Sequence, residues 1–241
     1  MALNKGIKGV YDKGILKAVF LAGGSGSGKS AVSNALFGLN FGFAPSGLKN
    51  VNNDKFFEFL LEKGKLSKDM TNLNDKEMSI IQDVRKKGKA LGISQYQMYL
   101  NGRLGMVIDG TGDSYSKISE QKKYLQSLGY DCIMVFVNTT LNKALERNMK
   151  RERKVPVDVA TTIWKAAQQM KKRYATLFKT NFTEIDNSTD SPTGRVQIAN
   201  KIQKKIDTFL NAPVKNPKGK AWIKSELAKK KNKSEGEFVF V

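Results

Sequence analysis

Histidine is absent from the 241 residues of the chain, and cysteine occurs only once. Without histidine there can be no Ser-His or Cys-His catalysis, no histidine general base and no histidine zinc site, so the expected proton acceptor is a carboxylate. A lone cysteine excludes a disulfide within the chain. Because Cys132 lies in the apolar run 132–137, we expect a buried, unreactive thiol rather than a nucleophile. Any bound metal should be a hard cation held by oxygen atoms.

Acidic residues are also scarce, and long apolar runs are missing. Asp and Glu number 22 against 42 Lys and Arg, which gives a net charge of +20. This excess favours polyanionic partners, nucleic acid first, although a lysine-rich surface without a partner is the alternative. No stretch reaches the 18 or more apolar residues of a membrane span, and no secretory signal opens the chain. We therefore expect no membrane partner and a cytoplasmic location.

The most informative segment is the octapeptide 23–30, which has the Gly-x4-Gly-Lys-Ser pattern of a phosphate-binding P-loop. Its residues are Gly23, Gly24, Ser25, Gly26, Ser27, Gly28, Lys29 and Ser30. The glycines let backbone N–H groups approach phosphate oxygens, Lys29 should reach the terminal phosphates, and the Ser30 hydroxyl should ligate Mg²⁺. A flexible Gly/Ser linker is the alternative, but an apolar run before the loop and helical spacing after it favour a nucleoside triphosphate site.

Strand-like and helix-like segments alternate along the chain. The expected strands are 15–22, 48–52, 104–109, 132–137 and 182–186. The expected helices are 30–37, 54–61, 75–101 with interruptions near Gly88 and Gly92, 117–128, 141–150, 157–178 and 196–210. This alternation predicts an α/β fold of the P-loop NTPase type, a parallel sheet with helices on both faces. Ligands then bind at the carboxyl ends of the strands.

The composition changes after residue 210, so we predict a P-loop domain over 1–210 and a lysine-rich C-terminal extension over 211–241. Residues 211–219 are typical of a linker. Residues 215–233 contain eight lysines and one acid, Glu226, and Trp222, Ile223 and Leu227 are spaced for a short amphipathic helix. The extension is either a solvated basic tail or an arm over 212–233 that contacts a partner or a polyanion.

Two aspartates and a basic segment are the candidates for chemistry. Asp54 follows the second strand, where its carboxylate can accept a proton from an attacking hydroxyl, or it caps the next helix. Asp109 ends the third strand, as a carboxylate that touches Mg²⁺ does, or it caps the following turn. Arg147 and Arg151 share a helix face within the basic segment 147–154. That segment is either a lid over the nucleotide or a solvated helix end.

Together with the P-loop and Asp54, the segments 107–112 and 144–159 resemble small P-loop kinases. The closest are the kinase domain of bacteriophage polynucleotide kinase and the zeta-toxin kinases. The resemblance implies that Lys29 and Ser30 bind phosphate and Mg²⁺. It further implies that Asp54 is the general base and Arg151 the lid arginine that stabilises the transition state. Arg147 would lie near the nucleotide base and phosphates, and Thr111 near the acceptor.

These inferences predict a Mg·ATP-dependent kinase that phosphorylates a hydroxyl, first of all a polynucleotide 5′-hydroxyl because of the +20 charge. A zeta-toxin-like kinase acting on a nucleotide sugar, or a small nucleotide or nucleoside kinase, is the alternative. A third possibility is an NTP-dependent nucleic-acid-binding or assembly protein. Phe57 departs from the polynucleotide kinases, which place an arginine at that position for a substrate phosphate. A phage gene would place the protein in the cytoplasm of a bacterial host.

Overall fold

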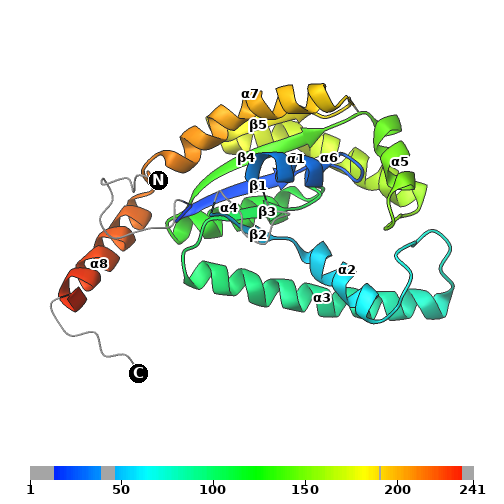
Figure 1. Cartoon of the computed structure of the whole chain (residues 1–241), viewed down its shortest axis with the longest axis horizontal. Helices are drawn as coiled ribbons and strands as arrows, with labels where there is room; N and C mark the ends of the chain where they lie inside the picture. The colour runs from blue at the N-terminus through cyan, green and yellow to red at the C-terminus, as the bar shows by residue number, and fades with distance from the viewer. Residues whose placement is uncertain (1–13, 39–46, 190, 235–241) are drawn as a thin grey trace.

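The three central strands of the sheet are built from continuous apolar runs, as expected for strands that helices cover on both sides. The computed structural model describes residues 14–38, 47–189 and 191–234. The strands are β1 (Lys17–Ala22), β2 (Lys49–Val51), β3 (Met106–Asp109), β4 (Asp131–Asn138) and β5 (Phe182–Asp186). They form one sheet in the order β2-β3-β1-β4-β5, and every neighbouring pair is parallel (Figure 1). The carboxyl ends of all five strands therefore lie along one edge of the sheet.

Alternate residues of β1 point to opposite faces of the sheet, and different helices cover the two faces. Val19 and Leu21 belong to the cluster that includes side chains of α1 (Lys29–Phe37) and α7 (Pro192–Asn211). Ala18 and Phe20 belong to the other cluster, which includes side chains of α4 (Tyr115–Ser127) and α6 (Val157–Phe178). The predicted α/β architecture is therefore confirmed.

Helices α2 (Asn53–Lys63) and α3 (Asp75–Asn101) pack against each other beside the β2 edge (Figure 1). Helix α3 is continuous, so the predicted interruptions near Gly88 and Gly92 are wrong. Both glycines are buried where the two helices touch. A Cβ atom at Gly88 would lie 2.9 Å from the backbone nitrogen of Phe57. These glycines permit close packing of the helices and do not break α3.

Cys132 is buried in β4, and burial raises the pKa of its thiol to about 12, as its apolar surroundings led us to expect. The remaining elements are α5 (Leu141–Lys150), a 3-10 turn (Lys179–Asn181) and α8 (Pro217–Ser234). The last of these is longer than the short amphipathic helix that we predicted. In the described part of the chain, no helix has the length and apolar character needed to cross a membrane.

The predicted boundary at residue 210 falls in the last turn of α7. Residues beyond it do not stand apart from the sheet, because Val214 is buried in the same cluster as Phe20. Residues 235–241 of the predicted extension, and 1–13 and 39–46 of the predicted P-loop domain, lie outside the described residues.

Candidate active site

The P-loop joins the end of β1 to the start of α1, and its glycines are confined by neighbouring elements. Gly26 and Gly28 have positive φ angles of 74° and 83°, which favour glycine. A Cβ atom at Gly26 would lie 2.1 Å from the carbonyl oxygen of Ala144 in α5, and one at Gly28 would lie 2.2 Å from Nδ2 of Asn187. The loop is thus held in shape by α5 and by the residues after β5. From the sequence, we explained these glycines only by the approach of phosphate to the backbone. That explanation accounts for part of the requirement for glycine, and the contacts with neighbouring elements account for the rest.

The ammonium group of Lys29 lies at the centre of the candidate site. Its Nζ donates to the carbonyl oxygens of Gly23 (2.7 Å) and Gly24 (3.2 Å). Burial lowers the pKa of Lys29, and the nearby Asp109 carboxylate opposes that effect. Arg151, Asp54 and Arg153 are also close enough to act on its pKa. Five charged side chains from four separate parts of the chain therefore converge beside the P-loop.

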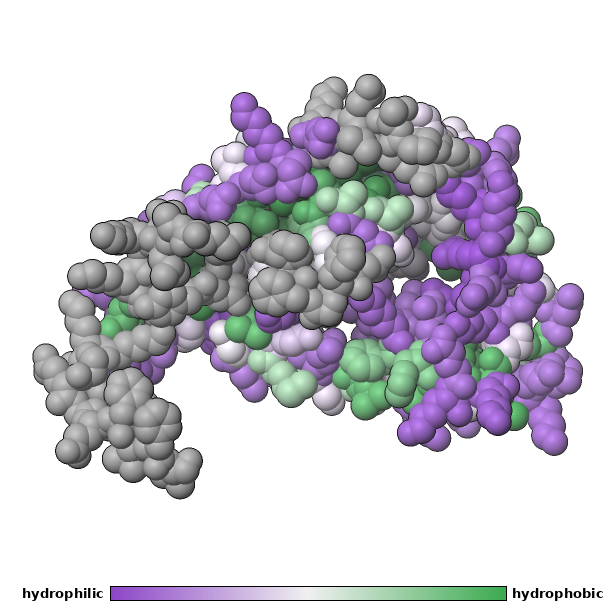
Figure 2. All heavy atoms as spheres, in the orientation of Figure 1, coloured by the Kyte–Doolittle hydropathy of each residue, from purple (hydrophilic) through white to green (hydrophobic). Residues whose placement is uncertain are grey.

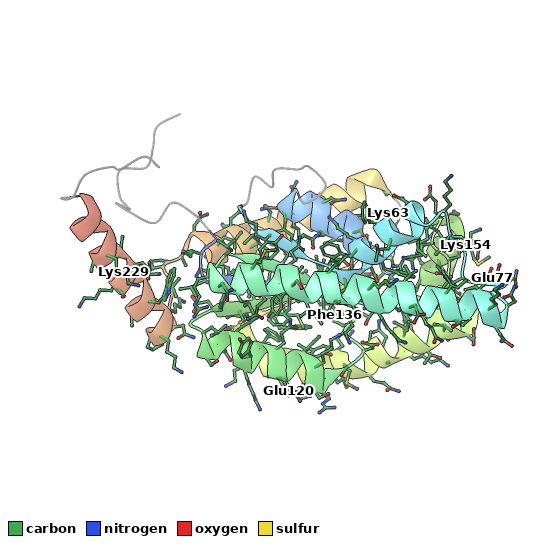
Figure 3. All side chains as sticks on the ribbon, turned by 90° about the horizontal axis from the view of Figure 1, so that it is seen from below. Lys63, Glu77, Glu120, Phe136, Lys154 and Lys229 are labelled. Carbon is green, nitrogen blue, oxygen red and sulfur yellow. The ribbon has the colours of Figure 1, made fainter. Side chains whose placement is uncertain are left out.

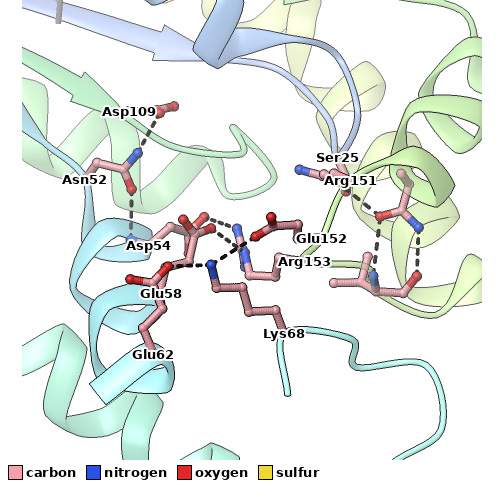
Figure 4. Close-up of polar contacts among 12 residues, drawn as sticks. Ser25, Asn52, Asp54, Glu58, Glu62, Lys68, Asp109, Arg151, Glu152 and Arg153 are labelled. Carbon is pink, nitrogen blue, oxygen red and sulfur yellow. Dashed lines mark hydrogen bonds and ion pairs between the residues drawn. The ribbon is translucent and has the colours of Figure 1, made fainter. Parts of the chain in front are cut away.

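Asn52 connects the two aspartates (Figure 4). Its Nδ2 donates to Asp109 Oδ2 at 2.9 Å, and its Oδ1 accepts from the backbone N–H of Asp54 at 2.8 Å. Asn52 is therefore the N-cap of α2, and the alternative in which Asp54 caps this helix is wrong. Asp54 occupies the first turn instead, with 60% of its side chain exposed. Burial raises the pKa of Asp109, whose Oδ1 is buried without a hydrogen-bond partner.

The segment after α5 crosses from the P-loop to α2. Arg151 Nη2 donates to Ser25 Oγ in the P-loop at 2.9 Å. Arg153 reaches the other side, where Nη2 donates to Asp54 Oδ2 and Nε donates to Glu58 Oε1, both at 2.8 Å. Residues 151–155, which we call the lid segment, thus touch both the phosphate loop and the helix that carries Asp54. This arrangement supports the lid interpretation of the basic segment.

A second set of contacts holds the lid segment against residues 64–70, which follow α2. Lys68 forms ion pairs with Glu152 of the lid segment (3.0 Å) and with Glu62 of α2. The backbone N–H of Met70 donates to the carbonyl oxygen of Lys154 at 3.0 Å. Hydrophilic side chains gather at this end of the molecule (Figure 2). The lid segment therefore packs against α2 and the residues that follow it through charged and backbone contacts.

Thr111 lies at the beginning of the P-loop and Arg147 near its end. Arg147 donates through Nη1 to the carbonyl oxygen of Asn187 (2.8 Å) and through Nη2 to that of Thr189 (3.0 Å). A Cβ atom at Gly28 would lie 3.5 Å from the same Nη1, so Arg147 borders the start of α1. The carbonyl oxygen of Thr111 accepts from the backbone N–H of Gly23 at 3.2 Å. Both predicted residues therefore adjoin the loop.

The oxygen donors near Lys29 fit a nucleotide-bound Mg²⁺. In the described ranges, no group of three or more His, Cys, Asp or Glu residues is arranged to hold a metal by itself. Mg²⁺ at a phosphate site needs only one or two protein oxygens, because phosphates and water supply the others. The unpartnered Asp109 Oδ1 is suited to that role, directly or through water.

Two residues of the site were not singled out from the sequence. Asn52 carries a recognisable signal, since an Asn directly before an amphipathic helix is a preferred N-cap. Arg153 lies in the basic segment, but helical spacing selected Arg147 and Arg151. Helix α5 ends at Lys150, so helical spacing does not apply to Arg153.

Comparison with known proteins identifies the family and the fold. The chain matches the zeta toxin family over residues 7–207. A kinase structure from Chloroflexus aurantiacus aligns with a TM-score of 0.51 at 12% identity, covering 80% of this chain and 96% of the other. The PezAT toxin-antitoxin system of Streptococcus pneumoniae aligns with a TM-score of 0.45 at 12% identity, covering 98% of this chain and 92% of that chain. No curated protein sequence matches.

The match spans most of the chain and includes the P-loop, both aspartates and the lid segment. The solved kinase with the TM-score of 0.51 shares the fold. The chain belongs to the zeta toxin family and is an ATP-dependent P-loop kinase.

Proposed function

We propose that this kinase transfers the γ-phosphoryl group of Mg·ATP to a hydroxyl group positioned at Asp54. The observation that carries the proposal is the convergence of Asp54, Asp109, Arg151 and Arg153 on the Lys29 ammonium. Phosphoryl transfer needs cations around the transferring group, a metal site and a residue that deprotonates the acceptor. These side chains supply each of those requirements at the carboxyl edge of the sheet.

The donor half of the site comprises the P-loop, Lys29, Ser30 and Asp109. Backbone N–H groups of the P-loop other than those of Gly23 and Ser27, which donate within the fold, bind the phosphates together with the start of α1, and Lys29 lies against the terminal phosphates. Ser30 and Asp109 would hold Mg²⁺, which neutralises charge that develops on the phosphate oxygens. Arg147 borders the start of α1, and in this proposal it contacts the nucleotide.

In the transfer step, Asp54 accepts the proton of the acceptor hydroxyl, and the oxygen of that hydroxyl forms a bond to the γ-phosphorus. The bond between that phosphorus and the oxygen bridging to the β-phosphate breaks, and ADP leaves. Arg153 engages Asp54 Oδ2 and fixes the direction of the carboxylate. Arg151, held at Ser25, and Lys29 stabilise charge on the transferring group.

For the acceptor, we favour a hydroxyl of a small nucleotide-linked molecule, such as the nucleotide sugar on which zeta-type kinases act. The lid segment contacts α2 beside Asp54, an arrangement that suits a small acceptor. Phe57 is buried against α3, so the phosphate-binding position of polynucleotide kinases is part of a hydrophobic cluster here. A polynucleotide 5′-hydroxyl is the second candidate, favoured by the net charge of +20.

The test is incubation with γ-labelled ATP and a panel of nucleotide sugars, nucleosides, and 5′-hydroxyl DNA and RNA. Asp54→Asn should lower the transfer rate by about 10²–10⁴-fold and leave ATP binding unchanged. Asp83→Asn, an exposed carboxylate of α3, is the matched control and should retain activity. Unchanged transfer by Asp54→Asn would show that the base is misassigned. ATP consumption without a labelled acceptor would favour the assembly-protein alternative.

A further inference from the structure

Helix α8 lies beyond residue 207, where the match to the zeta toxin family ends, yet its start is fixed to the kinase fold. The Asp131 carboxylate accepts from the backbone N–H groups of Lys215 (2.8 Å) and Asn216 (3.0 Å) and pairs with Lys17 at 3.0 Å. Gly219 is buried against Gly129, and a Cβ atom at position 219 would lie 2.3 Å from the Gly129 carbonyl oxygen. These contacts fix the start of the helix beside the amino-terminal end of β4.

Two large apolar side chains of α8 pack against the core. Trp222 and Ile223 pack against the cluster that contains Phe20 and Phe136. Trp222 and Ile223 therefore attach the helix, and Leu227 is half-buried. The outward positions Ala221, Ser225 and Ala228 are exposed and small.

The lysines of α8 flank the attached face in two rows. Lys218 and Lys229 are eleven residues apart, or close to three turns, and so lie on one line along the helix. Lys220 and Lys224 are four apart and lie on a second line. All four are exposed, and the acid on the helix, Glu226, pairs with Lys229 at 2.7 Å. The exposed surface of α8 is therefore basic on both sides of its outward face.

This surface fits a phosphate backbone better than a membrane. A helix that binds a membrane surface inserts large apolar side chains into the lipid, whereas Trp222 and Ile223 of α8 pack against the core. A nucleic-acid backbone needs only cations at intervals, and lysine ammonium groups provide them without base specificity. The 18 residues of α8 span about 27 Å, which is enough to follow several phosphates.

The surface is also remote from the site of phosphoryl transfer. In the register of β1 and β4, Lys17 pairs with Asp131, which holds the start of α8, whereas Ala22 leads into the P-loop. The six residues of β1 separate the two by about 20 Å. Figure 3 shows Lys229 and the lid residue Lys154 at opposite ends of the molecule. A nucleic acid on α8 is therefore not placed as the acceptor at Asp54.

We propose that Lys218, Lys220, Lys224 and Lys229 of α8 form a nucleic-acid-binding surface that contacts phosphate groups and is separate from the kinase site. The test uses the full chain without ATP or acceptor, so its result does not depend on the proposed reaction. Fluorescence anisotropy of labelled single-stranded DNA, duplex DNA and RNA is measured over a range of NaCl concentrations.

The test variant replaces the four α8 lysines with glutamine. Its control removes the same charge from exposed lysines of α2 and α3, through Lys63→Gln, Lys76→Gln, Lys87→Gln and Lys89→Gln. The α8 variant should lose at least tenfold in affinity at about 100 mM salt, and its salt slope on duplex DNA should fall by up to about 3.6. The control should change affinity less than threefold.

Both variants should keep the wild-type melting temperature, because the substituted side chains are exposed. Equal losses in the two variants would overturn the proposal, since the +20 charge as a whole would then explain binding. Binding of the wild-type chain to vesicles containing phosphatidylserine, without binding to any nucleic acid, would also overturn it.

Discussion

At the scale of single residues, Asp109 combines a functional position with a cost in stability. Its pKa is raised by burial, and Oδ1 has no hydrogen-bond partner. A raised folded-state pKa means that folding favours the neutral carboxyl. The associated stability is present below the unfolded pKa and is lost as pH rises through the folded pKa. Ionisation of Asp109 in the folded protein therefore carries a cost in stability, as expected for a group that binds Mg²⁺.

We predict that Asp109→Asn stabilises the nucleotide-free protein at pH 7 by about 0.5–2 kcal/mol and suppresses phosphoryl transfer. The neutral amide avoids burial of a charge, so the gain should shrink as pH falls toward 4. Urea denaturation at both pH values measures it. The matched control is Asp54→Asn, which makes the same chemical change at a mainly exposed side chain and should alter stability little. A destabilised Asp109→Asn protein at pH 7 would contradict the argument.

At the scale of elements, the contact between α2 and α3 depends on glycine. The Cβ atom of an alanine at position 88 would lie within 3.1 Å of the backbone N and Cα atoms of Phe57. Backbone atoms in a packed helix cannot move aside at low cost. We predict that Gly88→Ala destabilises the fold by about 1–3 kcal/mol, although alanine favours helix by about 1 kcal/mol.

Chemical denaturation of Gly88→Ala beside Ser79→Ala, at an exposed position of the same helix, separates packing from propensity. The control should lie within about 0.5 kcal/mol of wild type. If Gly88→Ala were more stable than wild type, helix propensity would outweigh the contact with α2.

The sequence predicts the helices and strands more fully than it predicts the contacts within the candidate site. Apolar runs and helical spacing are local: the apolar runs located the three central strands, and helical spacing predicted the order of the helices. The prediction that the glycines interrupt α3 is wrong because these glycines permit a contact with another helix. The spacing of residues within 75–101 carries no information about that contact. The pairing of Arg153 with Asp54 joins residues 99 positions apart, and no periodic pattern encodes it. Motif spacing located the phosphate loop, but only the fold shows that Asn52 connects Asp109 to α2.

At the scale of the whole molecule, the chain has two basic regions with different surroundings. Near the P-loop, Arg153 of the lid segment pairs with Asp54 and Glu58, and Glu152 of the same segment pairs with Lys68. On α8, lysines face solvent with little acidic compensation. The net charge alone does not distinguish a basic region that is paired with carboxylates from one that is not. The fold does, because it puts them at opposite edges of one sheet.

Whether α8 is part of the folded domain can be decided at Trp222. Its side chain packs against the core cluster that includes residues of α4 and α6, so its removal should lower the stability of the whole domain. We predict that Trp222→Ala lowers the free energy of unfolding by about 1–3 kcal/mol, below the 3–5 kcal/mol of a fully buried tryptophan because this one is half-buried. Circular dichroism during urea denaturation should show one cooperative transition at a lower midpoint.

Lys220→Ala, an exposed position of the same helix, is the control and should leave the midpoint within about 0.5 kcal/mol of wild type. An unchanged midpoint for Trp222→Ala would mean that residues 211–241 are an independent extension, as the predicted boundary at 210 has it. A lowered midpoint would place α8 within the cooperative unit. Because the surface proposed for nucleic acid lies on this helix, that result would mean that the kinase fold holds it rigidly.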